Sequence, residues 1–386
     1  MGMWVGRGRK ARRCYGFDEI SLIPGEVSIN PNEVDPSWEF AHQTYAVPII
    51  AASMDGVVDV GFAIKMGKLG GLAVLNLEGV QTRYDDPSDI LTKIAKATPE
   101  KATELVQKLY APKIKERLIE KRIKQIKKAG VTAIVSSIPQ RAEQFGKIAQ
   151  AAGADIFVVQ SQVSSVKHIS KEYRVCDYGK LCKSLKVPVI IGNAVTYKMT
   201  LQLMEVGASA VFIGVGPGAA CTTRGVLGIG VPQVTATCDA AAARDFHLKK
   251  TGKYVPIITD GGMTTGGDIC KAFASGADAV MVGSAFARAK EAPGKGCHWG
   301  MATPNINLPR GTRIRVGTTG SLEEILFGPA RTDDGTQNLM GAIRASMGSV
   351  GAATIKDFQL TEIIIAPAIK TEGKVFQNAQ KTGMCK

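Results

Sequence analysis

Cys221 is the residue of this chain best placed for covalent chemistry, because it stands at the tip of a glycine-rich loop. Gly214, Gly216 and Gly218 occupy alternate positions before it, and glycine allows a backbone to turn tightly and approach a ligand closely. The thiolate of cysteine is a strong nucleophile near neutral pH. Thr223 follows two residues later, where its hydroxyl can position a water molecule or a leaving group. A lone cysteine is more often structural, but this loop favours nucleophilic catalysis.

Two further glycine-rich turns predict a phosphate site. Asp260-Gly261-Gly262 forms the first turn and Gly283-Ser284 the second, and each follows an apolar run. Backbone N–H groups that are free of Cβ bulk and backed by a helix N-terminus bind phosphate. The Asp260 carboxylate beside them suits the hydroxyl groups of a ribose. The two turns therefore predict a nucleotide, whereas turn glycines alone would leave two matched loops unexplained.

Eight short apolar runs rich in Val and Ile are predicted to be buried parallel strands that carry these loops. The runs are Val47–Ser53, Gly71–Asn76, Val131–Ser137, Asp155–Gln160, Val187–Asn193, Ala210–Gly216, Val255–Gly261 and Ala279–Ser284. Four of the seven intervals between their starts are 23 or 24 residues, which suits a strand, a helix and two short loops. Helical patterns between them, Lys198–Val206 and Gly267–Ser275, each end at a glycine. The fold class expected is α/β, a (β/α)8 TIM barrel, which places its active site on the loops after the strands.

Three segments depart from a minimal barrel, and all belong to one predicted catalytic domain spanning residues 1–386. An N-terminal arm, residues 1–46, contains the extended-looking stretch Ile20–Gly25. A helical, Lys-rich insertion, residues 77–128, follows the second strand. Residues 293–320 follow the eighth strand and are dense in Gly, Pro, Thr and Arg, which predicts a mobile flap.

Composition restricts the partners and the compartment. Lys and Arg exceed Asp and Glu by 48 − 34 = 14, which favours anionic partners. The basic clusters, at the N-terminus and over Lys113–Lys128, have no interleaved aromatic residues, so we expect solvated faces and no specific nucleic acid. Eight cysteines without a CxxC pair, and four histidines, predict neither a disulfide framework nor structural zinc. We expect a cytoplasmic protein with no membrane partner, because no signal peptide or long apolar run is visible.

These motifs resemble the IMP dehydrogenase/GMP reductase family. The resemblance is carried by Gly214–Gly230 (GVGPGAACTTRGVLGIG), Thr259–Gly283 (TDGGMTTGGDICKAFASGADAVMVG), Val47–Val57 (VPIIAASMDGV) and Gly192–Thr196 (GNAVT). It extends from Tyr15 to about Ala352 and is most specific in the cysteine loop. The chain is most similar to a short branch of the family, found in some bacteria, that lacks regulatory CBS domains.

The resemblance implies an IMP dehydrogenase of guanine nucleotide biosynthesis that oxidises IMP to XMP with NAD. Cys221 would attack C2 of the purine and form a covalent thioimidate, Thr223 would assist, and water would hydrolyse the adduct. The implied substrate-binding residues are Met54, Asp260, Gly262, Gly283, Ser284 and Met301, and the implied cofactor-binding residues are Asn193, Gln160 and Gly214. The carbonyl groups of Gly216, Gly218 and Cys221 match a potassium site of many members, and the family is typically a homotetramer.

The chain also departs from the family pattern. Residues 77–128 are too few for a CBS pair, which needs roughly a hundred residues. The family's phosphate-contacting serine is Ala219 here, and Gln160 stands where many members have an aspartate. The flap region has no adjacent Arg-Tyr pair, the family's usual activator of water, and Arg310 occupies the position of a glutamate or glutamine.

These departures leave the hydrolytic group open, with Arg310, Arg313 and Arg315 as candidates and a phosphate or surface role as the alternative for each. They also leave two other functions open. A GMP reductase would share the cysteine and the phosphate turns but needs a carboxylate where Arg310 stands. A nucleotide-binding regulator would keep the phosphate site and lack efficient hydrolysis.

Overall fold

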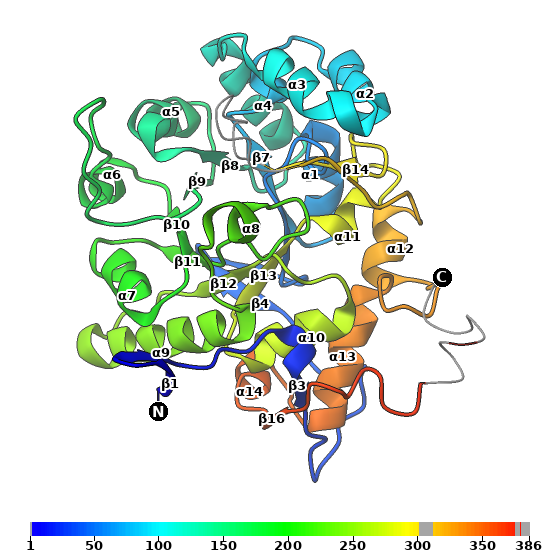
Figure 1. The fold of residues 1–386 in the computed structure, drawn as a ribbon. Coiled ribbons are helices and arrows are strands. Elements are labelled where there is room, and N and C mark those ends of the chain that lie inside the picture. Colours follow the sequence, from blue (N-terminus) through cyan, green and yellow to red (C-terminus); the bar gives the residue numbers. More distant parts are fainter. Residues whose placement is uncertain (1, 301–311, 375–378, 380–386) are drawn as a thin grey trace.

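Eight parallel strands form a closed barrel at the centre of the molecule (Figure 1). The computed structural model describes residues 2–300, 312–374 and 379. The barrel strands are β6 (Ile49–Ala51), β7 (Leu72–Asn76), β8 (Ile134–Ser137), β9 (Ile156–Gln160), β10 (Val189–Ala194), β11 (Ala210–Ile213), β12 (Ile257–Asp260) and β13 (Ala279–Val282). All eight predicted strands and the predicted TIM barrel are confirmed.

Each strand is apolar on both faces because one face lines the barrel and the other meets the helices. Ile50, Val74 and Ile258 belong to the cluster inside the barrel. Their neighbours Ile49 and Ile257 belong to the larger cluster under the helices. Successive side chains of a strand point to opposite faces, so a single run of Val and Ile fills both layers.

Eight helices make the outer ring (Figure 1). They are α1 (Val60–Lys68), α4 (Glu116–Lys128), α5 (Pro139–Ala151), α6 (Tyr178–Ser184), α7 (Tyr197–Glu205), α9 (Gln233–Thr251), α10 (Gly266–Ala274) and α13 (Leu339–Val350). The predicted helices at 198–206 and 267–275 are confirmed as α7 and α10. Gly207 and Gly276 follow their ends with φ of 104° and 106°, a conformation that favours glycine.

The N-terminal arm closes one end of the barrel. Its hairpin of β4 (Trp38–Phe40) and β5 (Gln43–Tyr45) places three aromatic side chains, Trp38, Phe40 and Tyr45, in the interior cluster. Earlier in the arm, β1 (Met3–Gly6) pairs with β2 (Arg9–Ala11), and β3 (Ile20–Leu22) pairs with β16 (Ile363–Ile365). Only the end where the strands terminate is left for a ligand.

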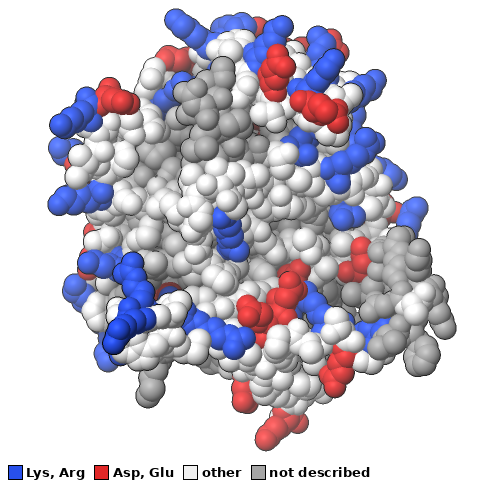
Figure 2. Space-filling model, in the orientation of Figure 1, with Lys and Arg blue, Asp and Glu red and all other residues white. Residues whose placement is uncertain are grey.

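The segment 77–128 contains one ring helix and a smaller insertion. Helix α4 packs between α1 and α5 in the ring, so the added part is α2 (Ser88–Lys96) and α3 (Pro99–Tyr110). These two helices enclose their own apolar cluster, which consists of Val80, Leu91, Ile94, Val106, Tyr110 and Trp299. Figure 2 shows Lys and Arg side chains gathered along the edge where Figure 1 places α2 to α4.

The described ends of segment 293–320 are packed against the insertion rather than loose. Strand β14 (Cys297–His298) pairs with β15 (Ile314–Arg315). The Arg313 guanidinium donates to the carbonyl oxygens of Ile94, Ala95 and Ala97 at 3.2, 2.6 and 2.6 Å, and so caps the C-terminus of α2. Residues 301–311, with the predicted site residues Met301 and Arg310, lie outside the described residues. Within the part of the chain that is described, no helix has the length and apolar character needed to span a bilayer.

A buried ion-pair cluster fixes the C-terminal region to the barrel. Asp278 accepts hydrogen bonds from Arg244 at 3.0 Å, from the Ile257 amide at 2.9 Å, and from Tyr254 and Lys356. Burial alone would raise the pKa of Asp278, but the charges of Arg244 and Lys356 lower it below its ordinary value. Lys356 lies in α14 (Ile355–Phe358), so this carboxylate links α14 to the base of β13.

We expect Asp278→Asn to lower the free energy of unfolding by about 3–5 kcal/mol, because the buried Arg244 guanidinium would lose its buried carboxylate partner and keep its pair with the exposed Asp245. Urea unfolding near neutral pH measures the change. Glu120→Gln is the matched control, since its pair with Lys124 is exposed on α4 and contributes no more than about 0.5 kcal/mol. Equal losses in the two variants would contradict the assignment.

Candidate functional site

The glycine loop after β11 lies against the end of β12. Gly214 has φ of 147°, and a Cβ there would lie 2.4 Å from the carbonyl oxygen of Asp260. Only glycine allows this approach, so the loop and the Asp260 turn are held together by backbone contact. The loop continues through Cys221 into α8 (Thr223–Leu227), which lies in front of the barrel strands in Figure 1.

The structure brings the two predicted catalytic residues of this loop together. The Cys221 thiol donates to Thr223 Oγ1 over 3.1 Å, and Cys221 is exposed whereas Thr223 is buried. Thr223 Oγ1 also accepts a hydrogen bond from the amide of Gln162, in the loop after β9. The exposed Cys221 thiol thus lies beside a buried threonine whose hydroxyl is also held by Gln162. Sequence reasoning missed Gln162, and the only signal for it is its position two residues after Gln160.

Asp260 lies between two amides from other strands of the barrel. Its Oδ2 accepts from Asn193 Nδ2 at 2.7 Å and from Gln160 Nε2 at 3.0 Å. Burial raises the pKa of Asp260 to about 6, and these two hydrogen bonds partly offset the increase. Gln160 and Asn193 are predicted cofactor-binding residues, and in this structure their amide nitrogens orient the predicted ribose-binding carboxylate.

The predicted phosphate turn at Gly283 lies beside the loop that follows β6, whereas the turn at Gly262 lies against Pro217 of the cysteine loop. Met54 lies in the loop after β6, three residues beyond the end of the strand, and its sulfur lies 3.0 Å from the place a Cβ on Gly283 would take. Ser284 Oγ and His298 Nε2 are 3.0 Å apart and share a hydrogen bond. Gly262 has φ of 81° in the turn after β12. Met54, Gly283 and Ser284 are therefore neighbours, as the nucleotide hypothesis requires.

His298 is a buried polar residue that sequence reasoning missed. It is 2% exposed, its Nδ1 has no hydrogen-bond partner among the described residues, and burial lowers its pKa to about 4. The imidazole is therefore neutral at physiological pH, with Nε2 bonded to Ser284 and Nδ1 available for a further hydrogen bond. Its only sequence signal is its position in the Gly-rich stretch that leads to Met301.

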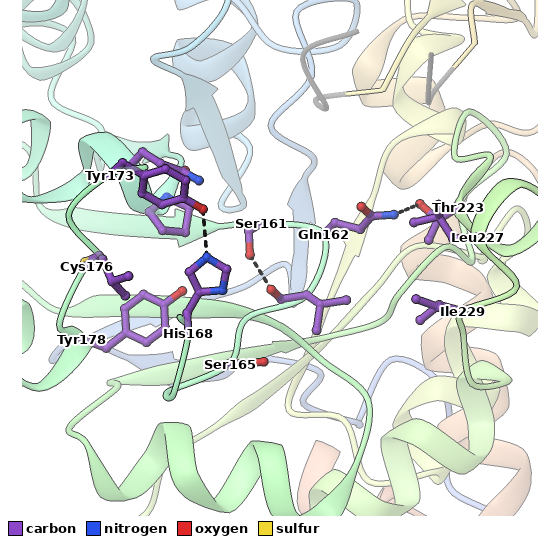
Figure 3. Close-up of a pocket in the computed structure, with 14 residues that line it drawn as sticks. Ser161, Gln162, Ser165, His168, Tyr173, Cys176, Tyr178, Thr223, Leu227 and Ile229 are labelled. Atoms are coloured by element: carbon purple, nitrogen blue, oxygen red, sulfur yellow. Dashed lines mark hydrogen bonds between the residues drawn. The ribbon is translucent and has the colours of Figure 1, made fainter. Parts of the chain in front are cut away.

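A cavity of about 420 Å³ opens beside Thr223 (Figure 3). The loop between β9 and α6 supplies most of its wall, including Gln162 and a hydrogen-bonded pair, His168 and Tyr173, whose side chains are 2.8 Å apart. Its size is that of a small-molecule site, and its wall mixes aromatic and polar groups. The cavity adjoins the Cys221–Thr223 pair, but the predicted cofactor-binding residues Gln160, Asn193 and Gly214 are not among the described residues that line it.

The geometry of the cysteine loop gives little support to the predicted potassium site. The carbonyl oxygens of Gly216, Gly218 and Cys221 are suitable ligands for a hard cation, although the Gly218 oxygen already accepts the Cys221 amide at 3.0 Å. The Arg224 guanidinium lies on the same loop and donates to the carbonyls of Val215 and Val231. A fixed positive charge there works against a second cation, and no step proposed below uses one.

Comparisons with known proteins agree with the motifs. The family model described as the IMP dehydrogenase / GMP reductase domain matches residues 14–301. An uncharacterized oxidoreductase of Mycobacterium leprae is 37% identical over 371 residues, covering 94% of this chain and 99% of the relative. The inosine-5'-monophosphate dehydrogenase of Borreliella burgdorferi is 30% identical, covering 90% of this chain and 93% of that one. The crystal structure of an IMP dehydrogenase/GMP reductase-like protein from Corynebacterium glutamicum is similar with a TM-score of 0.90 and 34% identity, over 94% and 97% of the two chains.

We expect Asp260→Asn to stabilise the protein by about 1–2 kcal/mol at about pH 7.5, because the ionised carboxylate disfavours the folded state. The folded pKa of about 6 lies above the ordinary value of 3.8, so the folded protein takes up this proton first as pH falls. The difference between variant and wild type therefore shrinks from about pH 6 downward and vanishes near pH 4. Urea unfolding across this range measures it.

Asp177→Asn is the matched control for that measurement, because the Lys180 backbone amide lowers the pKa of Asp177 and no gain in stability is expected. A loss of stability in Asp260→Asn at neutral pH, or a gain that is independent of pH, would contradict the electrostatic account.

Proposed function

Because this chain belongs to the IMP dehydrogenase/GMP reductase family, we propose that it is an NAD-dependent IMP dehydrogenase that converts IMP to XMP. The observation that carries the proposal is the exposed Cys221 thiol, 3.1 Å from buried Thr223, on a loop packed against Asp260. A nucleophile, a carboxylate and two phosphate turns then lie at one end of one barrel. That combination suits a purine nucleoside monophosphate, with the base near the thiol.

The proposed reaction begins when the exposed Cys221 thiol, oriented by its hydrogen bond to Thr223 Oγ1, loses its proton to solvent and its sulfur adds to C2 of the purine. Asp260, kept in place by Asn193 and Gln160, accepts hydrogen bonds from the ribose hydroxyls. Ser284 and the glycine turns bind the phosphate. Bound NAD supplies an acceptor for the hydride that leaves C2.

The remaining step cleaves the Cys221 adduct. Water adds to C2, the carbon–sulfur bond breaks, XMP leaves and the thiol is restored, so that IMP, NAD and water yield XMP, NADH and a proton. The Thr223 hydroxyl is within reach of the sulfur and is the described group best placed to orient this water. Following the family's usual assembly, we expect the enzyme to act as a homotetramer.

GMP reduction is the alternative that uses the same site. A reductase needs a carboxylate beside the threonine to carry a proton to departing ammonia. In the described residues the partners of the Thr223 hydroxyl are the Cys221 thiol and the Gln162 amide, and neither is a carboxylate. This observation favours oxidation of IMP.

We expect the purified protein to form NADH and XMP from IMP and NAD, and Cys221→Ala to lower this rate by at least about a thousandfold because the nucleophile is lost. Nicotinamide absorbance and product chromatography measure the reaction, with GMP and NADPH tested in parallel. Cys238→Ala, which removes an exposed cysteine of α9, is the matched control and should keep full activity.

Three results would contradict the proposal in different ways. Ammonia release from GMP with NADPH would make the protein a GMP reductase. A single hydride transfer per subunit, followed by a stalled adduct visible by intact-mass spectrometry, would indicate a nucleotide-binding regulator. Absence of XMP at enzyme-stoichiometric concentrations, with no adduct, would exclude purine oxidation altogether.

A further inference from the structure

A buried chain of hydrogen bonds joins three segments that are distant in sequence. Trp299 Nε1 donates to the Tyr110 hydroxyl over 2.8 Å, and that hydroxyl donates to Asp55 Oδ2. Asp55 follows β6, Tyr110 ends α3 of the insertion, and Trp299 follows β14. Their exposed fractions are 1%, 8% and 4%, so water does not compete for these bonds.

The two outer members of this chain also lie on segments in direct contact. A Cβ at Gly56 would lie 2.8 Å from the Cys297 carbonyl oxygen and 3.0 Å from the Trp299 ring. The Gly294 amide donates to the Gly56 carbonyl at 3.0 Å. The turn after β6 and the segment around β14 therefore fit together without spare space, and a shift of one displaces the other.

The same two segments carry residues of the nucleotide site. Met54 immediately precedes Asp55 and touches the Gly283 turn. His298 immediately precedes Trp299 and is hydrogen-bonded to Ser284. A group that fixes the distance between Asp55 and Trp299 consequently also fixes the distance between Met54 and Ser284.

We propose that Tyr110 is a positioning residue for nucleotide binding, holding the Met54 turn and the His298 segment at a fixed separation. The inference rests on the proposed function, since it takes the Met54–Ser284 region as the nucleotide site. It also assigns a structural role to the α2–α3 insertion, because Tyr110, at the end of α3, contacts Asp55 in the loop after β6. Arg313, which caps α2, holds the same insertion to β15 from the other side.

The electrostatics of Asp55 make the role of Tyr110 measurable. Burial raises the pKa of Asp55 to about 6, and the Tyr110 hydroxyl, the Val80 amide and the Arg83 charge partly offset the increase. Arg83 is the cation that faces this carboxylate, and it lies over the Tyr110 ring at 5.9 Å. Without the Tyr110 hydroxyl, the pKa of Asp55 rises further and the carboxylate is protonated at a higher pH.

The test compares Tyr110→Phe with Tyr84→Phe in the full chain. Both substitutions keep an aromatic ring at the insertion and remove one hydroxyl, but among the described residues the Tyr84 hydroxyl bonds the Leu109 carbonyl alone, at 2.9 Å. Tyr110→Phe should raise KM for IMP about tenfold, with kcat changed by less than about twofold. In the same variant, the acid limb of the pH profile of kcat/KM should move to higher pH. Hydrogen exchange of the backbone amides should become faster in residues 53–58 and 293–300. Tyr84→Phe should show none of these changes.

Identical kinetics and amide exchange in the two variants would overturn the proposal. So would a rise in KM for Tyr110→Phe that leaves both the acid limb and the exchange of these two segments unchanged. If the wild-type protein turns over neither IMP nor GMP, the proposed function fails. Amide exchange, which needs no substrate, then decides the positioning role of Tyr110 by itself.

Discussion

The pairing of β6 with β13 is the constraint on which the rest of the molecule depends. It closes the sheet, with Val280, Met281 and Val282 opposite Ile49, Ile50 and Ala51, and so makes the first and last strands neighbours. Closure removes both sheet edges and places all eight strand ends at one mouth. The β4–β5 hairpin fills the opposite end with aromatic side chains. The residues with polar side chains that follow the strands are therefore brought together at one end.

Three buried or partly buried carboxylates differ in the charge of their partners, according to whether they lie at the base or at the mouth of the barrel. Asp278 is surrounded by Arg244 and Lys356, its pKa is lowered, and it fixes the base of the barrel. Asp260 and Asp55 lie at the mouth, are hydrogen-bonded mainly by neutral groups, and have pKa values raised to about 6. Ionising a buried carboxylate that is bonded mainly by neutral groups costs stability, and such groups gather at functional sites.

The insertion after β7 is integrated with the mouth through polar bonds as well as apolar packing. Its two helices enclose a small apolar cluster that includes Trp299, while Arg313 bonds the end of α2. Removing either partner of these part-buried bonds would leave a polar group unsatisfied, which disfavours separation of the insertion from the barrel. The insertion thereby links the loop after the first strand to the segment after the last.

Much of this arrangement was predictable from local sequence. Buried parallel strands leave short runs of Val and Ile, and eight such runs determined the barrel before any contact was known. Cys221 and Thr223 were paired correctly because they are two residues apart on one glycine loop. Helix α4 was assigned to the insertion because its amphipathic pattern shows that one face is buried but not which element covers it.

Only the tertiary structure decided the contacts that support the site. Gln162 on Thr223, His298 near Ser284 and Tyr110 on Asp55 each join residues from different loops or helices. No periodicity marks such a contact, because the partners become neighbours only when the barrel closes. The sequence thus determined the eight strands, and it predicts Cys221 as the nucleophile and the glycine turns as the nucleotide site, because these features depend on neighbours along the chain. Barrel closure decided how these groups are oriented, because orientation depends on side chains that meet only in the folded state.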